Sequence, residues 1–276
     1  MAVAGPATIG DNCVDRYLPP IGRDLAGGNA LNVAAGLAAA GLPTAYVGAI
    51  GEDAEGKLIL AEGGAMGVDM SRVVVAPGHT GVTTITVTPE GERIFESEVL
   101  GTSGSFRPSD EATAFLATRS WVHATGPGHI VEALEAVAAA GVRVSYDVSQ
   151  PPRTERFEAL APVLEVAFLS AAGADAADAA DLAREAIRHG ARSAVVGRGK
   201  DGCLMLAGGD LLEQPALPAR VVDTLGAGDA LIAGVIAALL DGAPPAAALA
   251  RGARAAAAAC VHVGAWRPPE PLEAHG

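Results

Sequence analysis

Strand-like and helix-like segments alternate along most of this chain, and that alternation limits the possible folds more than any other feature. The segment 30–42 predicts a helix that ends near Gly41 and Pro43, and the apolar segment 44–51 predicts a strand. The same alternation resumes from about residue 121 and continues to two closing helices. Repeated strand–helix–strand units build a parallel sheet with helices on both faces. We therefore predict an α/β fold with a mostly parallel central sheet flanked by helices.

One stretch, residues 73–99, departs from this alternation. It is rich in β-branched residues and carries turn signals at Pro77-Gly78 and Pro89-Glu90-Gly91. This composition predicts a short antiparallel ribbon, which we interpret as a small β-sheet lid around 73–99. A length of 276 residues suits one large domain. We therefore expect a single α/β domain over 1–276, with the lid as its appendage.

Composition and charge exclude several classes of function. The longest strongly apolar stretch, at 230–240, is too short to span a bilayer. The N-terminus has no basic region of the kind that begins a signal peptide, so we expect a cytoplasmic protein. The net charge of −13 would repel nucleic acid and anionic membranes. We expect neither as a partner, and a polyanionic ligand would need amides, a helix terminus, a few basic side chains or a cation to hold it.

The cysteines and histidines carry no recognisable site. Neither the three cysteines nor the isolated histidines have the spacing of a disulfide framework or a zinc site. They are Cys13, Cys203, Cys260, His123, His129 and His262.

Two glycine patterns resemble nucleotide-binding motifs without meeting their requirements. Residues 51–58 nearly match a P-loop, but Leu58 replaces the required hydroxyl, and three acidic side chains would repel phosphates. Residues 197–202 match G-x-G-x-x-G, but the pattern continues into a strand-like segment instead of a helix. A nucleotide can still lie along this glycine turn.

The turn at Gly226-Ala227-Gly228 is followed directly by Asp229 and by an almost wholly apolar helix. Glycines let backbone N–H groups approach a ligand, and a helix N-terminus attracts anions. These amides could therefore form an anion hole for a transferring phosphoryl group, with Asp229 as the base that deprotonates a hydroxyl. We also expect the helix dipole to favour the ionised carboxylate. A plain Asp cap in a tight turn explains the same spacing, and the turn alone leaves both readings open.

The segment "DTLGAGD" at 223–229 resembles the C-terminal signature of the ribokinase-like, or PfkB, family of carbohydrate kinases. The segments "GGNALNVAAGLAAAG" at 27–41 and "VGAIGEDAEG" at 47–56 resemble its N-terminal signature. The resemblance covers nearly the whole chain. It implies a ribokinase-like fold with a β-sheet lid over the sugar, and ATP-dependent, Mg²⁺-assisted phosphorylation of a sugar hydroxyl.

Matching motif positions imply roles for particular residues. The resemblance implies that Asp229 is the catalytic base and that Gly226, Ala227 and Gly228 form the anion hole. It also implies contacts to the sugar, to ATP and to a monovalent cation such as K⁺. The sugar contacts would be Asp11, Gly27, Gly28, Asn29 and Asn32, the ATP contacts Gly197, Gly199, Gly202, Gly226 and Gly228, and the cation contacts Asp223 and Leu225.

The chain departs from the family pattern in two places. Ser170 and Gly173 stand where many members carry an Asn-x-x-Glu pattern linked to Mg²⁺, and Gly197 stands where a Thr often meets ATP. These departures bear on how magnesium is held.

The segments "TIGDNCVDRY" and "HVGAW" resemble the fructoselysine 6-kinase subgroup, which phosphorylates the 6-hydroxyl of a fructosyl amine. Such a substrate carries an ammonium group, which Asp15, Glu96 or Glu98 could hold, although we favour the reading that each is a solvent-facing lid residue. Arg93 could bind a hydroxyl or a phosphate. The alternatives are a family kinase for ribose, fructose, 2-keto-3-deoxygluconate or a nucleoside, and a non-catalytic sugar or nucleotide sensor. A homodimer formed through the lid is also open, because "VTTITV" at 82–87 is apolar and β-branched.

Overall fold

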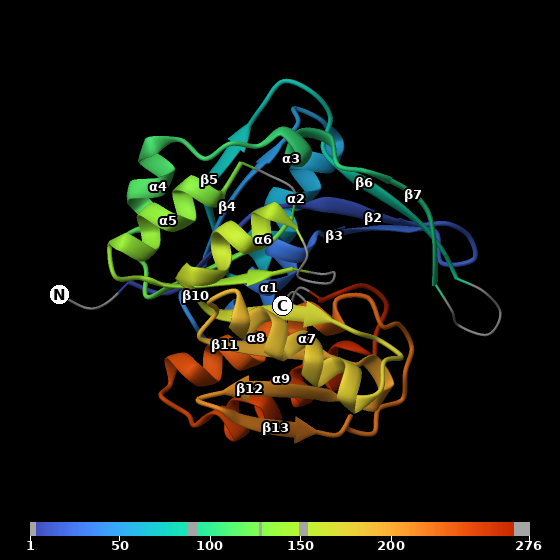
Figure 1. Cartoon of the computed structure of the whole chain (residues 1–276). Coiled ribbons are helices and arrows are strands. Elements are labelled where there is room, and N and C mark those ends of the chain that lie inside the picture. Colours follow the sequence, from blue (N-terminus) through green and yellow to red (C-terminus); the bar gives the residue numbers. More distant parts are fainter. Residues whose placement is uncertain (1–3, 88–92, 127–128, 149–153, 268–276) are drawn as a thin grey trace, which may run out of the picture.

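A large, mostly parallel sheet forms the centre of the computed structural model, which describes residues 4–87, 93–126, 129–148 and 154–267 (Figure 1). Within these residues the strands from β11 through β5 pair in parallel, and β12 and β13 add an antiparallel hairpin. The strand order is β13 (Asp210–Gln214), β12 (Cys203–Ala207), β11 (Ser193–Gly197), β10 (Leu164–Ser170), β9 (Arg143–Asp147), β8 (Trp121–Ala124), β1 (Ala7–Ile9), β4 (Ala45–Ile50) and β5 (Asp69–Val75). The predicted α/β class and flanking helices are confirmed.

Helices cover both faces of this sheet. One face packs against α1 (Asn29–Ala39), α2 (Ala54–Ala65), α8 (Ala227–Leu240) and α9 (Pro245–Ala259). The other packs against α4 (Asp110–Leu116), α5 (Val131–Ala139), α6 (Glu155–Leu160) and α7 (Ala176–Arg188). Strand β10 shows why both faces are apolar. Val166 and Phe168 enter the core beneath α8, whereas Ala167 and Leu169 enter the core beneath α7, because successive side chains point to opposite faces.

A smaller, separate sheet forms the lid that projects from the body of the molecule (Figure 1). Its strand order is β3 (Arg23–Gly27), β2 (Cys13–Tyr17), β6 (Val82–Val87) and β7 (Arg93–Val99). The sequence placed the lid in 73–99 alone, so it missed the two strands supplied by 13–27. It also included Val73–Val75, which the structure assigns to β5 of the large sheet, and the short helix α3 (Gly101–Ser105) follows the lid. The turn expected at 89–91 lies outside the described residues.

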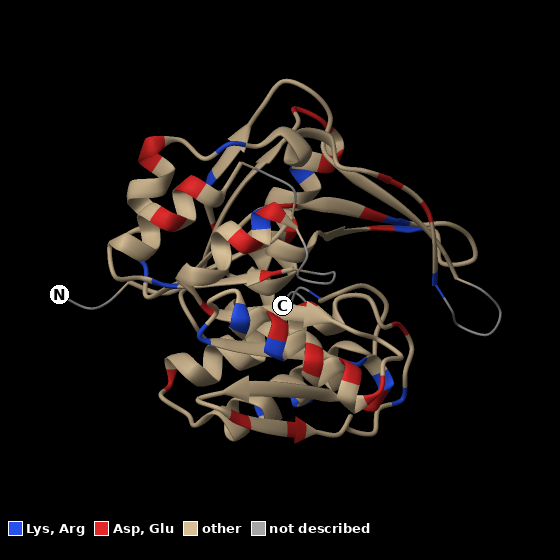
Figure 2. Ribbon diagram, viewed as in Figure 1, with Lys and Arg blue, Asp and Glu red and all other residues tan. Residues whose placement is uncertain are grey.

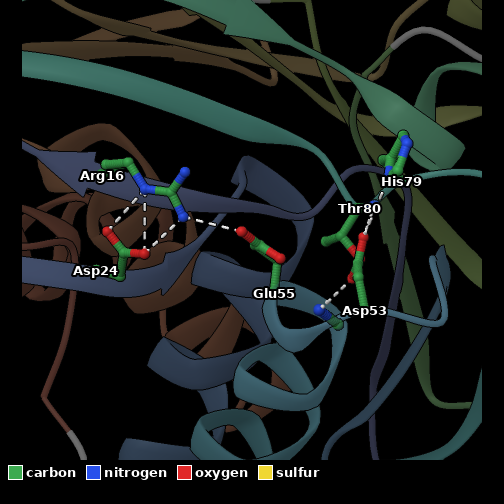
Figure 3. Close-up of polar contacts among 7 residues, drawn as sticks. Arg16, Asp24, Asp53, Glu55, His79 and Thr80 are labelled. Carbon is green, nitrogen blue, oxygen red and sulfur yellow. Dashed lines mark hydrogen bonds and ion pairs between the residues drawn. The ribbon is translucent and has the colours of Figure 1, made fainter.

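Polar contacts fix the base of the lid to α2 (Figure 3). Arg16 of β2 pairs with Asp24 of β3 (Nη2–Oδ2 2.7 Å) and reaches Glu55 in the first turn of α2 (Nη2–Oε1 2.9 Å). Asp53 caps α2 by accepting the Gly56 N–H at 2.8 Å, and it also accepts the Thr80 N–H and hydroxyl at 2.8 and 2.6 Å. In a P-loop this helix N-terminus would hold phosphate. Here the carboxylate of Asp53 occupies it, which explains why residues 51–58 are structural.

Acidic residues are spread over the outer helices and the lid of the described part of the chain (Figure 2). No helix among the described residues is long and apolar enough to cross a membrane.

Candidate active site

The carboxyl ends of the parallel strands meet at one edge of the large sheet, where ligands bind in open α/β folds. A cavity of about 290 Å³ opens there beside the lid strand β7 and the start of α8. Its lining contains both polar and apolar side chains, from the strand ends, the lid and α8. The residues are Asn29, Arg93, Asp147, Phe168, Leu169, Ser170, Val195, Gly197, Thr224, Gly226, Gly228, Asp229, Leu231 and Ile232.

Helix α8 begins at this cavity after Gly226, whose φ of 73° lies in the left-handed region. A side chain on Gly226 would be strained, and its Cβ would also lie 2.4 Å from the Cβ of Ala265. The first N–H groups of a helix have no intrahelical acceptor, so this end offers donors and positive potential. Gly226 and Gly228 line the cavity beside Asp229, which is 7% exposed. The structure therefore brings together the amides and the carboxylate that the sequence singled out.

Asn32 of α1 holds the carboxylate of Asp229. The Nδ2 of Asn32 donates to Oδ2 of Asp229 at 2.8 Å, and its Oδ1 accepts the indole N–H of Trp266 at 2.8 Å. The amide of Asn32 thus orients Asp229, and the sugar contact suggested for Asn32 stays a prediction. Trp266 carries no sequence signal for this role beyond its place in "HVGAW".

The environment of Asp229 raises its pKa well above the ordinary value. Burial is the largest cause, the hydrogen bond from Asn32 opposes it, and the nearby carboxylates of Asp147, Asp11 and Asp15 add to the rise. The sequence argument expected the helix dipole to favour the ionised form. Burial and like charge outweigh that effect here. A raised pKa suits a general base, whose efficiency is greatest when its pKa approaches the working pH.

Asp11 follows β1 and is fixed from two sides. Its Oδ2 accepts the backbone N–H of Asn29 at 2.8 Å, and its Oδ1 accepts the hydroxyl of Thr125. Gly28 precedes α1 with a φ of 98°, and its missing Cβ would collide with the backbone of Asn12. This glycine therefore lets the start of α1 approach the loop that carries Asp11.

The three acidic residues suggested for an ammonium group lie in different environments. Asp15 is 4% exposed on β2, and Gly27 leaves room for it, because a Cβ there would lie 2.0 Å from Oδ2 of Asp15. Burial raises the pKa of Asp15 to about 7, although the thiol of Cys13, which donates to its Oδ1 at 3.5 Å, opposes the rise. Glu96 and Glu98 are both exposed on β7. Asp15 is thus the buried candidate of the three.

The glycines suggested for ATP separate into two groups. Gly197 lines the cavity together with Gly226 and Gly228. Gly199 and Gly202 lie in the turn between β11 and β12, outside the cavity lining. Gly202 has a φ of 92°, and a Cβ at this position would lie 2.2 Å from the carbonyl oxygen of Gln214. The backbone of this turn therefore requires a glycine.

Sequence reasoning missed Asp147, whose position at the end of β9 brings it into the cavity with Asp229. The available signal was a carboxylate at the end of a buried strand. Ser170, noted only as a departure from Asn-x-x-Glu, also lines the cavity, whereas Gly173 lies in a turn with a φ of 82°. Within the described part of the chain, His, Cys, Asp and Glu form no group of three that could hold a metal.

Comparison with known proteins agrees with this geometry. Residues 22–271 match the pfkB family of carbohydrate kinases. The chain belongs to this family. It is 34% identical to a fructoselysine 6-kinase of Shigella flexneri over 94% of this chain and 98% of that protein. It is 29% identical to a fructosamine kinase of Bacillus subtilis, over 94% of this chain and 91% of the relative.

The solved structure of Arabidopsis thaliana ribokinase complexed with ribose and ATP superposes with a TM-score of 0.85. It shares 26% identity with this pfkB kinase, over 96% of this chain and 95% of that one. The ribokinase-like fold, expected from the two signatures, is confirmed. The chain is thus a kinase whose acceptor is a hydroxyl group.

The raised pKa of Asp15 predicts a pH-dependent loss of stability. Between about pH 4 and 7 the folded chain keeps a proton on Asp15 that the unfolded chain releases, so raising the pH favours unfolding. Asp15→Asn has no such group and should be more stable than the wild type at pH 8, by about 1–4 kcal/mol, with a smaller difference at pH 5. Chemical denaturation at both pH values measures this. The exposed Glu98→Gln is the control, and equal pH dependence of Asp15→Asn and the wild type would contradict the assignment.

Proposed function

We propose that this pfkB kinase transfers the γ-phosphoryl group of ATP to the 6-hydroxyl of a fructosyl amine such as fructoselysine. The relatives named for fructoselysine and fructosamine support this acceptor, because they cover nearly the whole chain. The single observation that supports the reaction most is the buried Asp229 beside the N-terminal amides of α8, in a cavity that also reaches the strand ends.

Asp229 accepts the hydroxyl proton in this proposal. The amide of Asn32, on α1, donates to Oδ2 of Asp229 and so orients the carboxylate. Helix α8, which carries Asp229, supplies the N–H donors. The amides at Gly226, Ala227 and Gly228 receive the phosphoryl oxygens as charge develops on them. The Ala227 N–H donates to the carbonyl of Thr224 at 3.3 Å. The N–H groups of Gly228 and Asp229 are therefore the ones better placed to bind a phosphoryl oxygen. The attacking oxygen and the leaving ADP lie on opposite sides of this turn, as in-line transfer requires.

The nucleotide lies along the edge formed by Gly197 and the turn before α8. Gly197 and Gly226 line one cavity, so phosphates placed there reach the helix amides directly. Gly199 and Gly202 shape the adjoining turn and support this edge from outside the cavity. The Leu231 and Ile232 side chains supply an apolar wall that excludes water from the transfer site.

Mg²⁺ fits the oxygen donors of this cavity. Asp147 contributes a carboxylate and Ser170 a hydroxyl to the same lining, and Mg²⁺ is usually bound by one or two carboxylates together with substrate phosphates. These two residues would hold it in place of the missing Asn-x-x-Glu pattern. When bound, Mg²⁺ offsets the negative charge of the phosphates.

The sugar lies between the sheet edge and the lid, near Asp11 and Asn29. Asp15, on the lid strand β2, lies near enough to Asp229 to raise the pKa of that carboxyl. A site that gathers this many carboxylates favours an acceptor that carries a positive charge. The ammonium group of a fructosyl amine supplies that charge, and Asp15 is its proposed partner.

A homodimer formed through the lid is a separate part of the proposal. The expected surface, 82–87, is the internal strand β6, whose Ile85 is buried. The exposed apolar side chains lie on the edge strand β7 and just beyond it, where Ile94, Phe95, Val99 and Leu100 are 39–57% exposed. An unpaired edge strand of this kind can pair with a second copy.

Replacing the proposed base should abolish turnover without loss of binding. Asp229→Asn keeps the size and hydrogen-bonding capacity of the side chain but cannot accept the proton, so kcat should fall by about 10²–10⁴-fold. ADP release measures kcat, and calorimetry measures binding of ATP and sugar. Asp241→Asn, at the opposite end of α8, should keep wild-type turnover. Wild-type-like turnover in Asp229→Asn would refute the assignment.

An acceptor panel identifies the substrate. ADP release should be most efficient with a fructosyl amine, and phosphorus NMR should place the new ester on the 6-hydroxyl. Asp15→Asn should lower kcat/KM for the fructosyl amine by about 10-fold and leave that for uncharged fructose unchanged. A preference for ribose, fructose, 2-keto-3-deoxygluconate or a nucleoside would instead identify another family substrate. Thermal shifts without ADP release would indicate a sensor.

The lid contact predicts a change of oligomeric state. Val99→Lys should shift the protein from dimer to monomer in sedimentation experiments, because a charge then enters an apolar edge. Asp210→Lys, on the exposed start of β13 in the large sheet, is the control. A wild-type protein that is monomeric at all accessible concentrations would exclude the dimer.

A further inference from the structure

Asp223 lies immediately before the active-site turn and is 4% exposed. Its Oδ1 accepts the N–H of Leu225 at 2.9 Å and lies 3.2 Å from Nε of Arg93. Its Oδ2 accepts the hydroxyl of Tyr17 at 2.5 Å and the N–H of Gly264 at 3.0 Å. An ionised carboxylate has about four lone-pair positions. The four donors around Asp223 therefore engage both of its oxygens fully.

These donors come from two separate parts of the molecule. Tyr17 and Arg93 belong to the lid strands β2 and β7, whereas Leu225 and Gly264 belong to the body. Arg93 also donates from Nη2 to the hydroxyl of Thr224 at 2.5 Å. The carbonyl of Thr224 in turn accepts the first N–H of α8, at Ala227. The lid is thus connected through Arg93 to the turn that forms the proposed anion hole.

Arg93 is the one Lys or Arg among the described residues that line the cavity. Its side chain is only 18% exposed, and the same cavity contains the carboxylates of Asp147 and Asp229. A guanidinium stays charged throughout the accessible pH range and keeps its donors in one plane. Arg93 therefore places a permanent positive charge beside the turn.

A monovalent cation at Asp223 and Leu225, which the family resemblance suggests, does not fit this arrangement. An alkali cation needs oxygen ligands, but the oxygens of Asp223 already accept N–H and O–H donors. Leu225 donates its N–H to Oδ1 of Asp223, which leaves its carbonyl oxygen as the one ligand it offers. The guanidinium 3.2 Å from Oδ1 would also repel a second positive charge.

We propose that the guanidinium of Arg93 supplies, from the lid, the positive charge that a free monovalent cation would otherwise supply at Asp223. Phosphoryl transfer by this chain then needs no alkali cation. Arg93 is a positioning residue: it acts on the phosphoryl group through Asp223 and Thr224, which shape the turn. Because Tyr17 and Arg93 belong to the lid, the carboxylate of Asp223 keeps all four donors only while the lid lies in the position seen here. This inference rests on the proposed kinase function.

The first test exchanges the salt around the wild-type enzyme. ADP release with a fructosyl amine is measured in potassium chloride and in choline chloride at equal ionic strength, with Mg²⁺ present in both. Equal rates are expected, and thermal unfolding without substrates should occur at the same temperature in both salts. Activity that requires potassium, or stabilisation by potassium but not by choline, would overturn the proposal. No ADP release in either salt would count against the kinase function alone, because the unfolding comparison still decides the cation question.

The second test removes the charge. Arg93→Ala should lower kcat by at least about 10-fold with little change in the KM for ATP, because the residue acts on the transfer step. Added guanidinium chloride, kept below denaturing concentrations, should restore part of kcat, and Arg93→Lys should retain more activity than Arg93→Ala. Arg72→Ala is the matched control, since Arg72 is also a strand arginine in an ion pair, with Glu111, but lies outside the cavity.

Rescue by guanidinium distinguishes a charge effect from simple loss of packing, which an added ion would not restore. Wild-type kcat in Arg93→Ala, or a loss that neither guanidinium nor the lysine variant relieves, would overturn the role. Circular dichroism verifies that each variant is folded. If Arg93→Ala does not fold, the salt exchange on the wild type still decides whether the enzyme needs an alkali cation.

Discussion

The hydrogen bond between Asn32 and Asp229 is the contact on which the rest of this site depends. It joins α1, near the start of the chain, to α8, near its end, across 197 positions of sequence. Both helices pack on the same face of the large sheet, and their packing brings an amide and a buried carboxylate within 2.8 Å. The bond also opposes the effect of burial on the pKa of Asp229. One interaction thus orients the proposed base and adjusts its proton affinity.

The gathering of acidic side chains at the sugar side has a cost in stability. Asp11, Asp15, Asp147 and Asp229 lie close enough that three of them raise the pKa of the fourth. Asp15 and Asp229, the two buried members, disfavour the folded state when ionised. Proteins accept such costs at functional sites, where the same groups bind substrate or move protons. A positively charged acceptor would relieve this repulsion on binding, which is why we favour a fructosyl amine over a neutral sugar.

The lid contributes chemistry as well as cover. Its strands come from 13–27 and 82–99, and its buried side chains reach the turn before α8 through Tyr17 and Arg93. On the other face of β2, Arg16 attaches the same sheet to α2. The lid is therefore held to the body at two places, one remote from the cavity and one beside it. In our proposal the contact of Tyr17 and Arg93 with Asp223 links the position of the lid over the sugar to the shape of the turn that binds the phosphoryl group.

The sequence by itself determined the α/β class, the family, and the turn at Gly226 with Asp229. Strand–helix alternation and an ordered glycine–acid motif are local patterns, and each can be recognised from a few consecutive residues. The sequence could not determine which residues complete the site. It placed the lid in one segment, because pairing of β2 with β6 joins strands almost 70 residues apart and leaves no local signal.

It also passed over Asp147 and Trp266, and it could not show which groups Asn32 and Asp223 contact. The partners of these side chains come from distant elements that meet only after the helices pack on the sheet. Tertiary packing alone decided them, since burial and proximity between remote residues set both the hydrogen bonds and the charges at this site.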